Sequence, residues 1–220
     1  MYPDWLRVQK QQMVNNGKGR VFIPTLTAAT YGEMDAIAVL DGTLHTYGVG
    51  ATGFSFFSSA DFDDGGKILA LSTATALAVP FEDHFFLGQP LGVLDLDQVR
   101  QSFMHSLQSH FHTQTYKDLI AMQIAPSENV LAWSGMSYQN SLWVVITPQN
   151  RGQKTTLKFK KGNGVAETAC DLVNGKVLTL DDLAFSAVLE ASIVLHISAD
   201  AATGPGCSAP VAKNLWWPQQ

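Results

Sequence analysis

Two patterns of apolar and polar positions divide the chain near residues 90–115. Before this point, short apolar runs alternate with segments whose apolar residues recur every three or four positions, as Ile37, Leu40 and Leu44 do. Runs of the first kind are typical of strands, and those of the second kind are typical of amphipathic helices. Such alternation favours parallel strands joined by crossover helices. The pattern predicts helix, strand, helix, strand and helix at residues 3–16, 20–26, 33–48, 53–58 and 66–79.

The second half of the chain contains short apolar runs separated by turn residues. Asn174-Gly175 lies between two of these apolar runs, and this dipeptide is typical of the turn of a β-hairpin. Strands at such short spacing favour an antiparallel sandwich. The runs cover residues 119–125, 129–135, 141–148, 155–161, 168–180 and 192–198, after a candidate helix at residues 97–111.

These patterns predict two domains and a tail. Residues 1–92 form the α/β unit, residues 93–200 the β-sandwich, and residues 201–220 a tail that contains three Pro and two Gly. Two parallel strands that are apolar on both faces cannot cover themselves, and each outer edge needs a partner. We therefore expect either further strands before residue 1 in the native parent, or pairing within a homo-oligomer.

Composition narrows the class of protein. The chain has 220 residues, of which 46% are hydrophobic and 15% are charged, so it is too apolar to be disordered. The formal net charge of −5 argues against nucleic acid as the main partner. No run of 18 apolar residues occurs, so no membrane-spanning helix is expected. Cys170 and Cys207 are compatible with one disulfide or with two free thiols.

Three stretches resemble the end of a (β/α)8-barrel glycoside hydrolase and the β-sandwich that follows it. VFIPTLTAATYGEMD (21–35) is similar to a seventh barrel strand and its active-site loop, and ATGFSFFSSADFDDGG (51–66) is similar to the eighth. The segment from NVLAWSG to SIVLHIS (129–198) resembles the C-terminal sandwich of many glycosidases. The resemblance implies an α/β partial (β/α)8 barrel, comprising the last two βα units, followed by an all-β antiparallel sandwich.

The resemblance also implies a carbohydrate substrate and places the chemistry at the carboxyl ends of the two parallel strands. Glycoside hydrolysis needs two carboxyl groups, one of which protonates the leaving oxygen while the other attacks or activates water. Glu33 and Asp61 are the candidate catalytic carboxylates. The candidate substrate-binding residues are Tyr31, Asp35, Asp63 and Asp64.

Each carboxylate also has a structural interpretation. Glu33 and Asp35 stand where a helix begins, and a helix N-terminus favours negative charge. The cluster of Asp61, Asp63 and Asp64 precedes the helix predicted at residues 66–79 and suits its N-cap region. Tyr31 suits either sugar stacking or the core.

No metal or cofactor site is expected. DFDDGG resembles the start of a calcium loop, but the twelfth position from Asp61 is Ser72 rather than Glu. His110 and His112 share one face of an extended segment but have no evident third ligand. The leading hypothesis is the C-terminal portion of a glycoside hydrolase, inactive or incomplete as this chain and completed by a missing N-terminal portion. The alternative is a non-catalytic carbohydrate-binding or interaction module.

Overall fold

The computed structural model describes residues 10, 21, 23, 25–26, 35–56, 65–91, 128–159, 167–205 and 207. Its first part contains the strands β1 (Thr25–Leu26) and β2 (Ser55–Phe56) and the helices α2 (Ala36–Gly48), α3 (Gly65–Ala78) and α4 (Glu82–Leu87). A 3-10 turn, η2 (Val79–Phe81), joins α3 to α4. Pro80 lies in this turn because proline cannot continue the helix.

The second part consists of strands. They are β3 (Gln89–Pro90), β4 (Val130–Tyr138), β5 (Ser141–Pro148), β6 (Gln153–Lys158), β7 (Thr168–Asp171), β8 (Lys176–Thr179), β9 (Ala184–Leu189) and β10 (Ile193–Ile197). Six of these strands form an antiparallel sheet in the order β3-β4-β5-β10-β7-β8, and β6 pairs with β9 in a separate antiparallel sheet.

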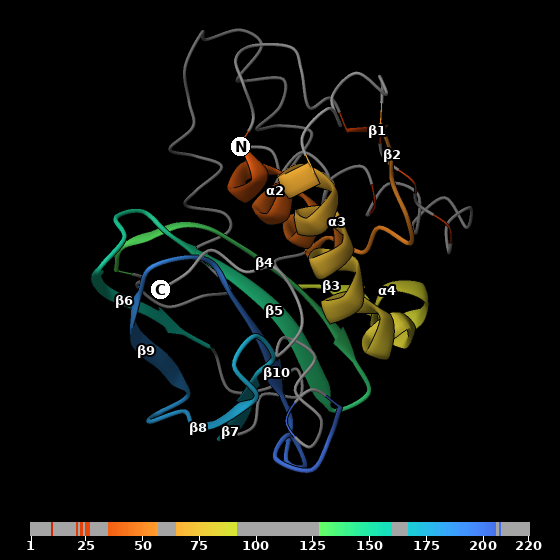
Figure 1. The fold of residues 1–220 in the computed structure, drawn as a ribbon. Coiled ribbons are helices and arrows are strands. Elements are labelled where there is room, and N and C mark those ends of the chain that lie inside the picture. The colour runs from red at the N-terminus through yellow and green to blue at the C-terminus, as the bar shows by residue number, and fades with distance from the viewer. Residues whose placement is uncertain are drawn as a thin grey trace, which may run out of the picture.

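The central strands β5 and β10 of the six-stranded sheet are buried on both faces. The helices lie on one side of this sheet (Figure 1). Successive side chains of a strand point to opposite faces, and β5 follows this rule. Trp143 and Val145 join the core formed with α2 and α3, whereas Leu142, Val144 and Ile146 join the core formed with β6 and β9. The described part is therefore layered, with helices on one side of the large sheet and the small sheet on the other.

This architecture corrects the expected fold class. The partial (β/α)8 barrel is wrong, because the described residues contain no barrel of βα units and their strands are mostly antiparallel. Strands β1 and β2 do pair in parallel, but each is only two residues long. The helices pack instead on the large antiparallel sheet, to which Met136 and Trp143 contribute apolar surface. The expected all-β sandwich is wrong for the same reason, since helices cover one of its faces.

Several predicted segments are present with small shifts of their ends. The helix predicted at 33–48 begins at Ala36, and the strand predicted at 141–148 has those bounds. The segments predicted at 97–111 and 119–125 and the domain boundary at residue 92 lie outside the described residues.

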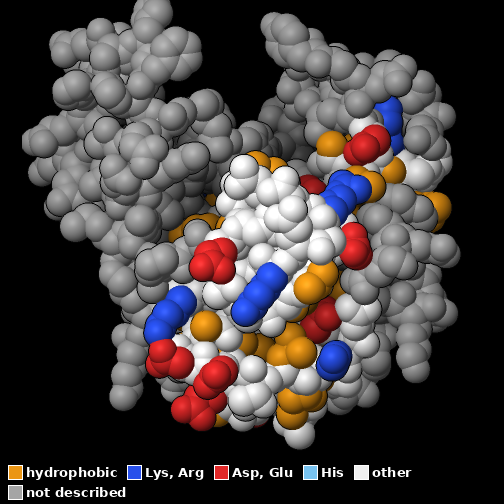
Figure 2. All heavy atoms as spheres, turned by 90° about the vertical axis from the view of Figure 1, so that its left-hand side faces the viewer, with side chains coloured by type: hydrophobic (Ala, Val, Ile, Leu, Met, Phe, Trp, Pro, Cys, Tyr) orange, Lys and Arg blue, Asp and Glu red, His pale blue; other side chains and the backbone are white. Residues whose placement is uncertain are grey.

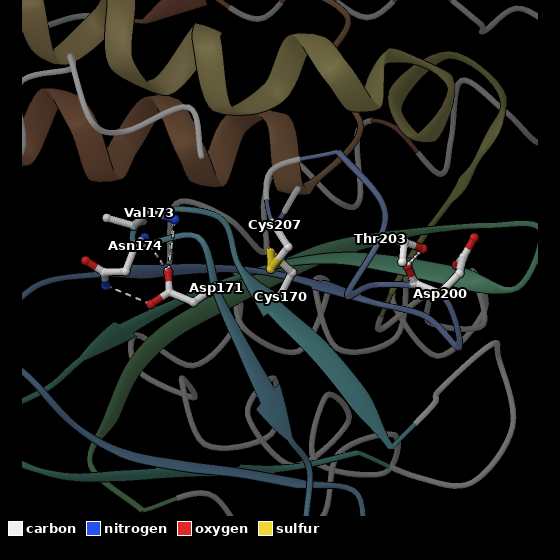
Figure 3. The surroundings of a disulfide bond; sticks show 7 residues. All are labelled: Cys170, Asp171, Val173, Asn174, Asp200, Thr203 and Cys207. Atoms are coloured by element: carbon white, nitrogen blue, oxygen red, sulfur yellow. Dashed lines mark hydrogen bonds between the residues drawn. A yellow bond between two sulfur atoms is a disulfide. The ribbon is translucent and has the colours of Figure 1, made fainter. Parts of the chain in front are cut away.

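The Asn174-Gly175 turn joins β7 to β8 as predicted. Asp171 organises it, since Oδ1 accepts hydrogen bonds from the backbone N–H groups of Val173 (2.9 Å) and Asn174 (3.2 Å). The other oxygen, Oδ2, accepts from the Asn174 amide at 2.7 Å (Figure 3). Gly175 has φ of +63°, a conformation that glycine adopts without steric cost.

A disulfide joins Cys170 of β7 to Cys207 (Figure 3). Cys170 is fully buried in the helix-facing core, and Cys207 packs against that core. The bond settles the question that the sequence left open and fastens the segment after β10 to the large sheet.

The face over β6 and β9 carries side chains of mixed character. Figure 2 shows acidic and basic side chains interspersed with apolar ones there. Lys158 and Asp182 form an ion pair, and Val188 is 62% exposed. Charges of both signs at this density are typical of a solvated surface, and exposed ion pairs contribute little stability.

We expect the disulfide to be a major contribution to stability. The bond closes a loop of sequence separation 37, for which loop-closure entropy predicts about 4 kcal/mol. The double variant Cys170→Ser/Cys207→Ser should lose about that much free energy of unfolding in urea titrations. Reduction of the wild-type protein should have a similar effect, whereas an unchanged urea midpoint in both would contradict the assignment.

Candidate functional site

The parallel pair β1–β2 defines the first candidate region. Thr25 pairs with Ser55 and Leu26 with Phe56, so the two strands run in the same direction without offset. The chain therefore leaves both strands at the same edge of this small sheet. The carboxyl ends of parallel strands are where such sheets bind their ligands.

Most of the candidate residues predicted from the sequence follow these two strands. Tyr31, Glu33, Asp61, Asp63 and Asp64 lie outside the described residues, and their roles stay predictions. Connectivity alone places Glu33 after β1 and Asp61 after β2.

Asp35 is described, and it has the structural role that its position suggested. Its Oδ1 accepts a hydrogen bond from the Ala38 N–H at 2.8 Å, which makes Asp35 the N-cap of α2. Such a cap satisfies one of the helix's orphan donors. Substrate binding by Asp35 stays a prediction.

A buried chain of polar side chains connects α2 to the large sheet. His45 Nδ1 lies 2.8 Å from Ser134 Oγ, and His45 Nε2 lies 2.8 Å from Thr147 Oγ1. Thr147 Oγ1 lies 2.6 Å from Ser192 Oγ, which donates to Asp41 Oδ1 at 2.6 Å. We call these five residues the polar chain. It runs from Ser134 on β4 to His45 on α2 and then to Thr147 on β5. From there it passes through Ser192, just before β10, and ends at Asp41 on α2.

The polar chain runs from a partly exposed end to a fully buried one. Asp41 is partly exposed, whereas His45, Thr147 and Ser192 are buried and Ser134 has no exposed surface. Burial raises the pKa of Asp41 to about 6, an effect that the Ser192 hydrogen bond and Arg151 oppose. Ser134 cannot act as a nucleophile on an external substrate, because no solvent reaches it.

Close backbone approach makes this contact possible. A Cβ atom at Gly48 would overlap the Ser134 hydroxyl, so only glycine lets the last turn of α2 lie directly on β4. None of the five residues of the polar chain is among the candidates predicted from the sequence. The available signal was polar Ser134 and Thr147 within strands that are otherwise strongly apolar.

A second cluster pairs two histidines beside the β4–β5 hairpin. His84 of α4 hydrogen-bonds Ser141 Oγ through Nε2 at 2.8 Å, and its ring centroid lies 6.1 Å from that of His196. The rings of Phe81 and Tyr138 border the pair. Both histidines are buried.

Burial sets the charge state of this pair. Desolvation, reinforced by the neighbouring His196, lowers the pKa of His84 to about 4 from an ordinary value of 6.5. Desolvation also lowers the pKa of His196, although Asp200 opposes the shift. Both rings are therefore neutral at neutral pH.

Within the described ranges, no group of three or more His, Cys, Asp or Glu side chains is arranged so that it could hold a metal ion. The same part of the chain contains no helix long and apolar enough to span a membrane.

Comparison with known proteins gives no family for the chain. No protein-family model matches it, and no curated protein matches it either. The function must therefore be argued from the residues themselves.

The polar chain should stabilise the packing of α2 on the sheet. Thr147→Val keeps the side-chain shape but leaves buried polar groups of His45 and Ser192 without this partner. The expected loss is about 1–3 kcal/mol in the free energy of unfolding.

Thr156→Val is the matched control, since the Thr156 hydroxyl hydrogen-bonds the exposed Ser186 and is not part of the polar chain. We expect its effect to be within about 0.5 kcal/mol. Equal effects of the two variants on chemical denaturation would mean that the polar chain contributes nothing specific.

His84 should make stability fall in acid. The unfolded state binds a proton near pH 6.5, but the folded state binds it only near pH 4, so the unfolded state gains stability between these values. The stability that wild type has relative to His84→Gln should therefore decrease as the pH falls from about 7 to about 4.

This comparison isolates His84 together with its effect on the neighbouring His196, because the remaining groups titrate equally in both proteins. Urea titrations at several pH values measure it. A difference that stays constant across the whole range would show that burial does not perturb His84.

Proposed function

We propose that this chain binds carbohydrate through carboxylates that follow β1 and β2, and that it is part of a protein that hydrolyses glycosidic bonds. The observation that carries the proposal is the parallel, unstaggered pairing of the two strands. This pairing brings the segments that contain Glu33 and Asp61 out of one sheet edge. The proposal requires that both strands end at the same edge of the small sheet, but it does not require a (β/α)8 barrel.

The chemistry at such an edge depends on two carboxyl groups with different roles. A protonated carboxyl donates its proton to the glycosidic oxygen, and the other carboxylate attacks the sugar or activates a water molecule. Carboxylates also accept hydrogen bonds from sugar hydroxyls, and such charge-assisted bonds are stronger than neutral ones. Glu33 and Asp61 are the proposed pair, and Asp63 and Asp64 are proposed to bind sugar hydroxyls.

Strands within residues 129–198 form most of the large sheet on which α2 and α3 pack, and also the β6–β9 pair that covers the other side of this sheet. Because both faces of the central strands β5 and β10 are used in packing, we assign the large sheet a scaffolding role and propose sugar binding at the β1–β2 edge.

Calorimetric titration of the full chain with a panel of oligosaccharides tests the proposal. We expect binding of at least one glycan, weakened about 10- to 100-fold by Glu33→Gln or Asp61→Asn because each removes a charge-assisted hydrogen bond. Asp181→Asn and Glu190→Gln are the matched controls, since both carboxylates are exposed beside β9. These controls should bind like wild type.

The outcomes separate the alternatives. Absence of binding to every glycan, or binding that neither Glu33→Gln nor Asp61→Asn affects, would contradict the proposal. Binding unaffected by these two variants would favour a non-catalytic carbohydrate-binding module. We expect no full turnover of aryl glycosides by this chain, and efficient turnover would show that its catalytic groups are complete.

A further inference from the structure

The direction of each hydrogen bond in the polar chain follows from one fixed donor. Ser192 Oγ donates to Asp41 Oδ1, so its own single proton is committed. A hydroxyl has one proton to donate, so Thr147 must donate in the short Thr147–Ser192 contact. Thr147 Oγ1 then accepts from His45, whose Nε2 carries the ring proton.

The other ring nitrogen completes this arrangement. A neutral imidazole has one donor nitrogen and one acceptor nitrogen, so His45 Nδ1 accepts from the Ser134 hydroxyl. With Asp41 ionised, all the protons of the polar chain therefore point toward its carboxylate. The direction of every hydrogen bond in the polar chain therefore depends on the protonation state of Asp41 at its exposed end.

A protonated Asp41 would reverse this direction. Its carboxyl would donate to Ser192, Ser192 to Thr147, and Thr147 to His45 Nε2. The neutral ring would then carry its proton on Nδ1 and donate to Ser134. The Ser134 hydroxyl has a second acceptor available, because the His45 carbonyl oxygen lies 3.5 Å from its Oγ. The geometry thus accommodates both directions with every group paired.

We propose that the polar chain is a two-state device in which the protonation state of Asp41 selects the tautomer of the buried His45. The two states differ by one proton in total, which Asp41 takes up from solvent. The imidazole stays neutral in both states: when the contact between α2 and the sheet opens transiently, its Nε2 proton passes to a water molecule and Nδ1 takes a proton from water. The hydroxyls of Ser192, Thr147 and Ser134 keep their protons and turn.

The groups around Asp41 indicate that the tautomer of His45 should change at mildly acidic pH. Burial raises the pKa of Asp41 to about 6, and Asp35 on the same helix acts in the same direction. Arg151, which follows β5, acts against it. The hydroxyls that β4 and β5 present to His45 carry no charge. The tautomer should therefore change with a midpoint near pH 6.

Nitrogen-15 NMR of the 220-residue chain tests the proposal, because protonated and unprotonated imidazole nitrogens have very different chemical shifts. His45 signals are assigned by their loss in His45→Gln. From about pH 8 to about pH 4.5, the proton should move from Nε2 to Nδ1 in wild type.

Two variants should abolish the change. Asp41→Asn cannot titrate, so the His45 tautomer should not change with pH in this variant. Ser192→Ala cuts the chain between Asp41 and Thr147, and the tautomer should lose its dependence on pH. Asp35→Asn is the matched control, since asparagine also caps helices, and it should keep the change.

Three outcomes would overturn the proposal. One is a single His45 tautomer in wild type across the range, and another is protonation of both ring nitrogens in acid. The third is a tautomer change that persists in Asp41→Asn. Far-ultraviolet circular dichroism of each variant confirms that the fold is retained.

Discussion

The structure depends on one constraint, the burial of both faces of β5 and β10, the central strands of the large sheet. Strand β5 supplies alternate side chains to two cores, and β10 does the same with Val194 on the helix side and Leu195 on the other. A sheet used in this way must be covered twice, because either face left open would expose a continuous apolar surface. Helices α2 and α3 cover one face, and the β6–β9 pair covers the other.

Polar groups within such a sheet are stable only if they are paired. Ser134 and Thr147 point to the helix side of β4 and β5, where an isolated hydroxyl would be costly. The His45 ring hydrogen-bonds both hydroxyls, and Ser192 and Asp41 extend these hydrogen bonds toward solvent. Because hydrogen bonds are directional, this arrangement fixes where α2 lies on the sheet more narrowly than apolar contacts alone.

Local patterns predicted much of the secondary structure. A short apolar run identified β5 at residues 141–148, and helical periodicity predicted the C-terminal ends of α2 and α3 to within one residue. The layer arrangement was not predictable in the same way, because helix periodicity shows that one side of a helix is apolar but not which sheet covers it. Parallel strands suggested a barrel, whereas Val39 and Leu44 of α2 pack on the antiparallel sheet.

The candidate site was predictable only in part. Asp35 was recognised as a helix-start carboxylate, since its position before an apolar periodic segment indicates a cap. The polar chain joins residues up to 151 positions apart in the sequence, as Ser192 and Asp41 show. Such pairings arise from tertiary packing, and no local spacing indicates them.

The covalent link between β7 and Cys207 also restricts where this molecule can mature. Disulfides form and persist in oxidising compartments and are rare where glutathione and thioredoxin keep thiols reduced. Cys170 is sealed in the core once folding is complete, so its oxidation must accompany folding rather than follow it. A host that oxidises thiols during synthesis is therefore the appropriate source of native protein.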